Sequence, residues 1–417
     1  MSRCHYYAAV LALLTVLSPA AAPTTQQLQR AFAGLDALMG TFWSRENAYL
    51  MEEAPARSGP QREGLLGFWN YQESIHAMAL GARLAPASRY AATLQQLVSA
   101  QQAQGGRQRG TGASGWQRQF YDDMNWAVLA LIAAFDATAE PSYLRTARAI
   151  FHNITVAATR DCGGGVWWDT KHTEKATASN AGPALSGALL HARTPAGENV
   201  LPPSSYLAWA ERVYAHWNRT MSDPQTGAVT DHIAVNMTAG TCAKVHWSFT
   251  YNEGLMLGAA TALGASSNSS AAAAVYAADA ARFAYHLVHK QTKGGVLFDA
   301  CETRCSSCCD CQSFKGIAAR ELARWLQAQP APAAPAPSVL PASSGPSSSA
   351  RPLRDEVEAL LGASAEAVWA GRSASPTSPS LPLFSAGWLQ PVTCIANAAA
   401  HTSGTLALLS DAIVRQS

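Results

Sequence analysis

Apolar residues recur with helical spacing over most of the chain. In the segment 142–154 they return every three or four positions, at Leu144, Ala147, Phe151 and Ile154. Because residues with this spacing share one face of a helix, the pattern predicts an amphipathic helix that covers a core. The segments 205–218 and 271–290 repeat the pattern, so we expect helices of the same kind there.

Three other segments, 125–135, 180–192 and 251–263, are dominated by small and apolar residues. A helix that is apolar on nearly every face has no side left for water, so we expect these segments to be buried. Buried and amphipathic segments alternate, which predicts stacked helical hairpins. Further helices are expected at 26–42, 70–84, 88–104, 314–328, 352–363 and 391–410, about twelve in all. Six hairpins that close into a double ring are the simplest assembly.

The double ring predicts where polar groups gather. If each outer helix returns the chain, the inner helices are parallel and their N-termini share one end of the ring. The polar residues expected at those N-termini are Asp122, Asp123, Asn180, Asn252, Glu253 and Lys315. Each is ordinary as a helix cap, because unpaired N–H groups at a helix start favour such side chains. Their convergence at one rim predicts a site.

Composition narrows the class of protein. The chain has 417 residues, 48% of them hydrophobic, which is enough for a sizeable core. Its formal net charge is only +2, and Lys and Arg are scattered without a basic stripe. Nucleic acid is therefore not expected as a partner.

The N-terminal residues 1–22 are typical of a secretory signal peptide, with one Arg, a short apolar run and then small residues. A signal anchor would need an apolar run of about 20 residues, and Ser18-Pro19 ends this one earlier. We expect residues 23–417 to form a single catalytic domain, interrupted by a flexible Pro/Ala/Ser-rich insertion at 329–351. We expect the mature protein to be a monomer that is secreted or held in the cell wall and that has no transmembrane helix.

Export favours disulfides, because eight cysteines remain after the signal peptide is removed. The cluster from Cys301 to Cys311 has the composition of a zinc site, but an oxidising compartment favours disulfides over zinc. A bridge between Cys162 and Cys242 would brace two loops that lead to inner helices. Four sequons, at Asn153, Asn218, Asn236 and Asn268, fit a glycosylated secreted protein.

The most suggestive chemistry lies in the stretch 121–135, where Asp122 and Asp123 precede an apolar run. Adjacent residues have Cα atoms about 3.8 Å apart, so their carboxyl groups readily sit about 5 Å from each other. That separation is typical of a retaining glycosidase, in which one carboxylate attacks and the other donates a proton. An inverting enzyme needs about 6.5–9.5 Å, which adjacent residues reach less easily. The helix dipole is expected to help keep Asp122 ionised.

Sugar binding would add aromatic platforms and polar side chains. Trp167, Trp168 and Asp169 follow a run of three glycines, which favours an exposed loop, and Tyr121 begins the acidic stretch. The alternative for any single Trp is a place in the core. No cofactor and no metal are expected, because neither a glycine-rich nucleotide loop nor a His-rich helix pair occurs.

Four motifs, in order YDDMNWAVLAL, GGGVWWDTKHTEKATASNA, TYNEGLMLGA and SFKGIAARELARWL, resemble glycoside hydrolase family 76, the endo-α-1,6-mannanases. The likeness runs from about residue 69 to residue 388. The Cys301-Glu302 tract followed by Ser313-Phe314-Lys315-Gly316 most resembles the fungal cell-wall members of the family. Some of those members are thought to act as transglycosidases on the mannose core of GPI-anchored proteins.

The resemblance implies an (α/α)6 barrel, in agreement with the helix count. It also implies a retaining mechanism with Asp122 as the nucleophile and Asp123 as the acid/base. The expected function is a secreted, endo-acting hydrolase of α-1,6-mannosidic linkages, with a mannan or GPI-anchor glycan as its partner. Two alternatives stay open: a transglycosidase that links proteins to cell-wall glycan, and a non-catalytic glycan-binding wall protein.

Overall fold

The computed structural model describes residues 25–53, 64–105, 115–198, 204–304, 310–329, 351–389 and 397–416. The predicted signal peptide and nearly all of the predicted insertion lie outside these residues. Twelve helices occur in the described part. Six form an inner ring: α3 (Phe68–Leu84), α5 (Tyr121–Thr138), α7 (Thr177–Arg193), α9 (Thr250–Ser266), α11 (Cys311–Ala328) and α13 (Ala398–Val414). Six lie outside: α2 (Thr25–Phe42), α4 (Tyr90–Gly105), α6 (Pro141–Thr155), α8 (Tyr206–Met221), α10 (Ser270–Lys290) and α12 (Leu353–Ala370).

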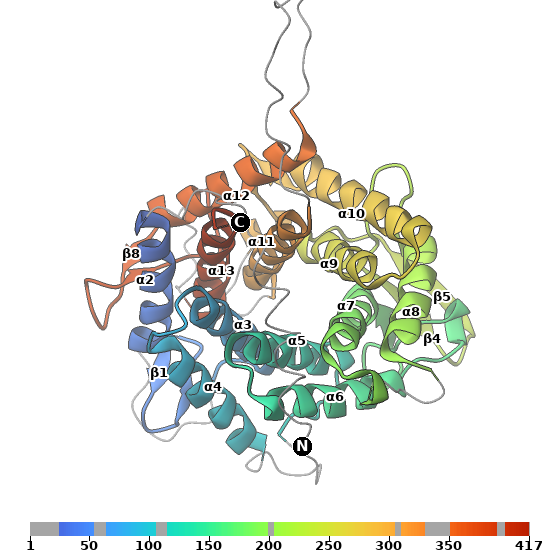
Figure 1. The fold of residues 1–417 in the computed structure, drawn as a ribbon, viewed down its shortest axis with the longest axis horizontal. Helices are drawn as coiled ribbons and strands as arrows, with labels where there is room; N and C mark the ends of the chain where they lie inside the picture. The colour runs from blue at the N-terminus through green and yellow to red at the C-terminus, as the bar shows by residue number, and fades with distance from the viewer. Residues whose placement is uncertain are drawn as a thin grey trace, which may run out of the picture.

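Each inner helix packs against the next, and α13 closes the ring by packing against α3 (Figure 1). Each outer helix covers an inner one; α6, for example, lies against α5, and α8 lies against α7. The predicted double ring of about twelve helices, an (α/α)6 barrel, is confirmed in the part of the chain that the structure describes.

The inner helices are buried on nearly every side, and most of their side chains are small or apolar. In α5 the nine residues 124–132 are all buried. Glycine allows the closest approaches: a Cβ atom at Gly254 would lie 2.9 Å from the Ala318 Cα, and one at Gly316 would lie 2.7 Å from the Ser403 Cα. These two positions therefore keep α9, α11 and α13 close together.

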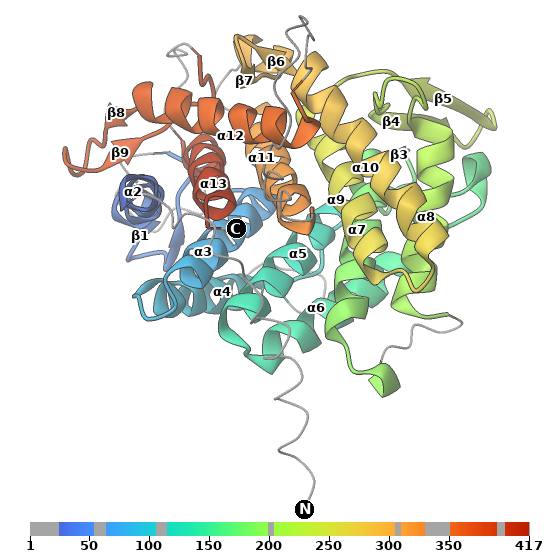
Figure 2. The same cartoon turned by 45° about the horizontal axis from the view of Figure 1, so that its top comes forward.

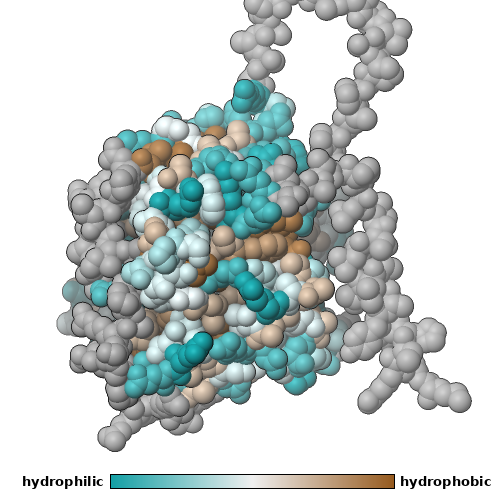
Figure 3. All heavy atoms as spheres, turned by 90° about the vertical axis from the view of Figure 1, so that its left-hand side faces the viewer, coloured by the Kyte–Doolittle hydropathy of each residue, from teal (hydrophilic) through white to brown (hydrophobic). Residues whose placement is uncertain are grey.

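The outer helices are amphipathic, as the spacing predicts. In α6 the buried residues are Leu144, Ala147, Ile150, Phe151 and Ile154, which include the whole predicted stripe. The view from the side of α2 shows hydrophilic and apolar residues intermixed (Figure 3). Among the described residues, no helix is both long and apolar enough to span a membrane.

A charged bridge crosses the barrel interior between α3 and α11, which are not neighbours in the ring. Arg320, which is 3% exposed, donates from Nη1 to Glu73 Oε2 at 2.6 Å. Its Nε donates to Glu321 Oε1 at 2.8 Å. Moving charged groups from water into the core is costly. Removing one member of this bridge would therefore leave a buried charge without its partner, which destabilises the fold.

Strands are short and lie in the connections between helices. The largest sheet is antiparallel, in the order β3 (Glu174–Ala176), β4 (His232–Asn236) and β5 (Thr241–Val245). β4 and β5 lie beside α8 (Figures 1 and 2). The remaining strands form two-residue pairs: β1 (Trp43–Ser44) with β2 (Tyr49–Leu50), β6 (Thr292–Lys293) with β7 (Val296–Leu297), and β8 (Ser373–Ala374) with β9 (Pro382–Leu383). The 3-10 turns are η1 (Asp161–Gly163), η2 (Ala196–Glu198) and η3 (Ala300–Arg304).

Two disulfides secure connections at the inner-helix starts. Cys162 in η1 is bonded to Cys242 in β5, which confirms the predicted pairing. Cys301 in η3 is bonded to Cys311, the first residue of α11, which agrees with disulfides rather than zinc in that cluster. The other four cysteines of the expected mature chain lie outside the described residues.

Candidate active site

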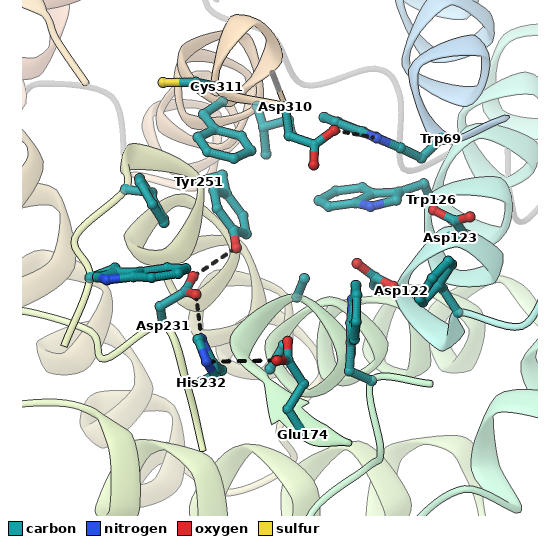
Figure 4. Close-up of a pocket in the computed structure, with 18 of the residues that line it drawn as sticks. Trp69, Asp122, Asp123, Trp126, Glu174, Asp231, His232, Tyr251, Asp310 and Cys311 are labelled. Carbon is teal, nitrogen blue, oxygen red and sulfur yellow. Dashed lines mark hydrogen bonds and ion pairs between the residues drawn. The ribbon is translucent and has the colours of Figure 1, made fainter. Parts of the chain in front are cut away.

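A cavity of about 740 Å³ opens where the starts of five inner helices meet (Figure 4). Trp69 belongs to the first turn of α3, and Asp122 and Asp123 to that of α5. Tyr251 belongs to the first turn of α9, and Cys311 begins α11. The cavity is lined by Trp69, Phe120, Asp122, Asp123, Trp126, Trp168, Glu174, Ala176, Ala178, Asp231, His232, Trp247, Phe249, Tyr251, Cys301, Asp310, Cys311, Phe314 and Ile317. The end of the ring where the sequence predicted that the inner-helix N-termini gather therefore contains a pocket.

The start of α5 is fixed by the loop that contains Trp168. The Tyr121 backbone N–H donates to the Trp168 carbonyl oxygen at 2.8 Å, and Phe120 forms a β-bridge with Asp169. Phe120 precedes the helix in an extended conformation and provides no capping side chain. The first turn therefore begins at the pocket wall, with Asp122 and Asp123 both facing the cavity.

Both carboxyl groups of the pair have raised pKa values. Burial raises the pKa of Asp122 well above its usual range and the charge of Asp123 raises it further, against hydrogen bonds from Trp168 and from the helix backbone. Burial raises the pKa of Asp123 to about 7, although the Arg118 guanidinium lowers it. Hydrogen bonds from the helix backbone favour an ionised Asp122, but burial outweighs them and the net shift of its pKa is upward. Two close, desolvated carboxyl groups do not both ionise readily, so the pair retains a proton near neutral pH.

A second polar group, on the β3–β4 side of the pocket, is organised by Asp231. Its Oδ1 accepts hydrogen bonds from Tyr251 Oη and Asn252 Nδ2, both at 2.9 Å. Its Oδ2 lies 2.8 Å from His232 Nδ1. His232 Nε2 in turn lies 3.6 Å from Glu174 Oε2 (Figure 4). The hydrogen bond to Asp231 raises the pKa of His232, and the charge of Glu174 acts in the same direction.

A third acidic group, Asp310, faces the pocket from the residue before α11. Its Oδ1 accepts a hydrogen bond from the Trp69 indole N–H at 3.0 Å (Figure 4). Asp310 is exposed, but the surrounding protein removes part of its hydration and raises its pKa, whereas the bond from Trp69 lowers it. The Trp69 ring lies 6.0 Å from that of Trp126, so two aromatic rings lie together on this wall beside Asp310.

The predicted residues near Trp168 occupy different positions. Trp168 lines the pocket, 4.4 Å from Phe120 by ring centroids. Tyr121 is half-buried beside the catalytic candidates. Trp167 is fully buried, with its ring stacked on His172 at 4.5 Å. Asp169 Oδ1 accepts a hydrogen bond from the Thr173 backbone at 3.0 Å. Tyr121, Trp167 and Asp169 are not among the cavity-lining residues, and they shape the loop that carries Trp168.

Asn180 and Asn252 lie at the expected helix starts but bond to protein groups. Asn180 Oδ1 accepts from the Val166 backbone N–H at 2.7 Å, and its Nδ2 donates to the carbonyl oxygens of Val166 and Ala176. Asn252 Nδ2 donates to Asp231, a pocket residue. Each residue therefore contacts a wall of the cavity from behind.

Glu253 and Lys315 are also directed away from the cavity. Glu253 Oε1 accepts from the Val229 backbone N–H at 2.9 Å and its Oε2 from Gln291 Nε2 at 2.9 Å. Lys315 Nζ donates to the Ala386 carbonyl oxygen at 2.7 Å and pairs with Glu302. Both side chains are fully buried, and they join the inner-helix starts to neighbouring loops.

Five further residues with hydrogen-bonding side chains were not predicted from the sequence. Trp69, Glu174, Asp231, His232 and Asp310 all line the cavity, and none was proposed as a site residue. Asp231 and His232 are adjacent, which is a recognisable polar signal. Their relation to Glu174 depends on the pairing of β3 with β4, in which Ala176 is opposite His232.

Comparison of the sequence with known proteins finds a matching family and a relative. The family model described as glycosyl hydrolase family 76 matches residues 28–344. Mannan endo-1,6-alpha-mannosidase DCW1 of Candida glabrata is 32% identical over 127 residues, which are 28% of this chain and 26% of that protein. The match therefore spans about a quarter of the length of that curated relative.

Solved structures share the fold over nearly the whole chain. An inactive variant of the alpha-1,6-mannanase of Salegentibacter sp., with two adjacent aspartates replaced and alpha-1,6-mannotriose bound, superposes with a TM-score of 0.73 and 19% identity, covering 93% of this chain and 99% of that one. Dfg5 from Chaetomium thermophilum, in complex with glucosamine, gives a TM-score of 0.67 and 18% identity, covering 94% of this chain and 91% of that one. At these identities the likeness shows a common fold.

Proposed function

Because this chain belongs to glycosyl hydrolase family 76, we propose that it cleaves α-1,6-mannosidic linkages inside a mannan chain, with retention of configuration at the anomeric carbon. The observation that carries the proposal is the pair Asp122 and Asp123, which faces an open cavity from the start of a buried helix. Adjacent carboxyl groups suit the short separation that a retaining double displacement needs.

In the proposed reactive form, the proton that the pair retains lies on Asp123 and Asp122 is ionised. In the first step, Asp122 attacks the anomeric carbon while Asp123 gives this proton to the departing glycosidic oxygen. The bond from C1 to that oxygen breaks and a glycosyl ester forms on Asp122. In the second step, Asp123 removes a proton from water, the water oxygen bonds to C1, and the ester bond to Asp122 breaks. The raised pKa of Asp123, about 7, suits a group that must both give and take a proton near neutral pH.

The opposite wall is proposed to hold the hydroxyl groups of the reacting mannose. Asp231 and His232 provide an acceptor and a donor, with Glu174 as a further acceptor. Trp168, whose side chain hydrogen-bonds to Asp122, adds an aromatic ring to the pocket wall. We assign the predicted residues Tyr121, Trp167, Asp169, Asn180, Asn252, Glu253 and Lys315 to positioning these walls. Each would then affect substrate binding through a cavity residue that it holds in place.

A glycan substrate also suits the proposed location of the protein. The alpha-1,6-mannanase of Salegentibacter sp. is described with bound mannooligosaccharide, and the Candida glabrata relative is named a mannan mannosidase. The two disulfides are of the kind favoured in an oxidising compartment. We therefore propose a secreted or cell-wall monomer that acts on a mannan or a GPI-anchor glycan.

A transglycosidase using the same two aspartates is the second candidate. It is favoured by the likeness to Dfg5, whose structure holds glucosamine. The two activities share the first step and differ in the acceptor, which is water in hydrolysis and a sugar hydroxyl in transfer. A non-catalytic glycan-binding protein would need no acceptor at all.

One experiment separates the three functions. The purified protein is incubated with α-1,6-mannan and a labelled mannooligosaccharide, and proton NMR records the anomer formed first. Short free products of α configuration support the hydrolase, whereas elongated labelled chains support the transglycosidase. Binding without turnover, unchanged in Asp122→Asn, would support the glycan-binding protein. A first product of β configuration would contradict the nucleophilic role of Asp122.

A further inference from the structure

An aromatic wall leads from the pocket toward solvent. Tyr251 lies in the first turn of α9, and its ring stacks on Phe249 with centroids 6.1 Å apart and planes 17° apart. Phe249 is followed outward by Trp247, at a centroid distance of 6.1 Å. All three residues line the cavity. The wall is therefore continuous with the proposed reaction site and extends beyond it.

Trp247 differs from the rest of this wall in its exposure. Its side chain is 57% exposed, although it is one of the largest apolar groups in the chain. The neighbouring rings of His232 and Phe249 meet the indole at interplanar angles of 73° and 66°. Neither ring stacks on the indole. These edge contacts therefore orient the Trp247 ring without stacking on its faces. Exposed aromatic surface beside a pocket is typical of a binding site.

The segment that carries Trp247 is fixed at several points. Strand β5 pairs with β4 and is joined to η1 by the Cys162–Cys242 disulfide. Lys244 Nζ donates to the Thr220 carbonyl oxygen, and His246 Nδ1 lies 3.2 Å from Thr230 Oγ1. A rigid platform binds a ligand with little loss of conformational freedom. The exposure of Trp247 is thus combined with a fixed position.

We propose that Trp247 is the platform of an outer subsite, against which a mannose ring stacks at a position beyond the one bound between Asp122 and Asp231. The proposal rests on the proposed function, because it takes an α-1,6-linked mannan chain as the ligand. One face of a pyranose ring presents C–H groups, and these pack against the negative face of an aromatic ring. The remaining hydroxyl groups stay in water, which an exposed platform allows.

The first test measures kcat/KM for α-1,6-linked mannooligosaccharides of increasing length, from the shortest that the wild type cleaves. In the wild type, kcat/KM is expected to rise with length once the chain reaches Trp247. In Trp247→Ala that rise is expected to shrink by roughly 3- to 10-fold, the range for one aromatic contact. Cleavage of the shortest substrate, which does not reach Trp247, is expected to change least.

Two further variants sharpen this test. Trp247→Phe keeps a smaller ring and is expected to recover part of the length dependence. Tyr285→Ala removes another large exposed ring, 50% exposed, from α10 and is expected to match the wild type at every length. An equal loss at all lengths in Trp247→Ala, or no loss at any length, would overturn the proposal.

A second test separates this inference from the proposed function. Calorimetry measures the affinity of long and short mannooligosaccharides for a chain carrying Asp122→Asn and Asp123→Asn, with and without Trp247→Ala. The platform predicts a weaker affinity, again by roughly 3- to 10-fold, for the long ligand alone. If the wild type binds the long ligand but does not cleave it, the proposed function fails, and the platform stands when Trp247→Ala weakens that binding. If affinity is unchanged in the Trp247→Ala protein, the platform fails whatever the catalytic result.

Discussion

His232 Nε2 lies 3.6 Å from Glu174 Oε2, while its Nδ1 lies 2.8 Å from Asp231 Oδ2. One imidazole ring thus stands between two carboxylates on the pocket wall. Without a positive ring, these carboxylates would face each other across a partly desolvated space. The protonated form of His232 is therefore the one that the folded protein favours, and its pKa is raised.

The first prediction concerns stability and pH. Because the folded-state pKa of His232 is raised, its stabilising contribution is complete below the unfolded-state value of about 6.5 and is lost as the pH rises through the folded-state value. We expect His232→Gln to lower the free energy of unfolding by on the order of 1 kcal/mol at pH 5.5. The difference from the wild type should shrink toward pH 9. Denaturant unfolding across this pH range measures it.

His152→Gln, on the exposed side of α6, is the matched control and should leave the pH dependence unchanged. A constant difference between wild type and His232→Gln from pH 5.5 to pH 9 would show that the imidazole is not held in its charged form.

The second prediction assigns the roles of Asp122 and Asp123. The two carboxyl groups titrate as one unit, so the protonation of the free enzyme does not identify the nucleophile. The Ala variant of the acid/base is expected to lose about 10²- to 10⁴-fold in rate, and that of the nucleophile at least as much. Azide should restore turnover of an activated α-mannoside by each single variant.

The azide product reveals which group was removed. In Asp122→Ala, azide takes the place of the nucleophile and should give the β-mannosyl azide. In Asp123→Ala, azide opens the ester on Asp122 and should give the α-mannosyl azide. Proton NMR distinguishes the two products, and the double Ala variant should not be rescued. Exchanged anomers would reverse the assigned roles.

The double ring was predictable because its signals are local. Helical spacing at Leu144, Ala147 and Phe151 needs only one segment to be read, and the apolar run after Asp123 identifies a buried helix by itself. Asp122 and Asp123 could likewise be predicted as a pair, because they are neighbours in the sequence. These features depend on residues within a few positions of each other, so no knowledge of partners was required.

The directions of single side chains were less predictable, because a helix start does not reveal which face meets the pocket. In α11 the residues that line the cavity are Cys311, Phe314 and Ile317, three positions apart. Lys315 lies on a different face of the same helix and is buried against Glu302. His232 was missed because its role depends on strand pairing across about 60 residues of sequence, which local spacing does not encode.

The third prediction concerns the charged bridge across the barrel. Arg320→Leu leaves Glu73 in the core without its guanidinium partner, and we expect a loss of about 3–5 kcal/mol in the free energy of unfolding. The double variant Glu73→Leu with Arg320→Leu should recover part of this loss, because Glu73 then leaves no unpaired charge and Glu321 keeps its ion pair with Arg324. Urea unfolding compares the variants.

A surface ion pair provides the contrast. Arg148 pairs with Glu198, whose side chain is 60% exposed, and Arg148→Leu should cost less than about 1 kcal/mol. A similar small effect for Arg320→Leu would mean that the interior of the barrel is wetter than the structure indicates.

The fourth prediction uses Glu253, whose pKa burial raises to about 8. Between the unfolded-state pKa of about 4.3 and this value, the folded chain keeps a proton that the unfolded chain has lost, so stability falls as the pH rises. Glu253→Gln cannot ionise, and its carbonyl oxygen can still accept the hydrogen bond from the Val229 N–H. We expect the variant to become more stable than the wild type by roughly 1–3 kcal/mol as the pH rises from 4.5 to 7.

Thermal unfolding at several pH values between 4.5 and 7.5 measures this change. Glu211→Gln, at a partly exposed position of α8, should follow the wild type and thus controls for the general loss of a carboxylate. A Glu253→Gln chain whose advantage is the same at pH 4.5 and pH 7.5 would contradict the prediction. That result would mean that Glu253 ionises normally in the folded state, and that water reaches the α9 start behind the pocket wall.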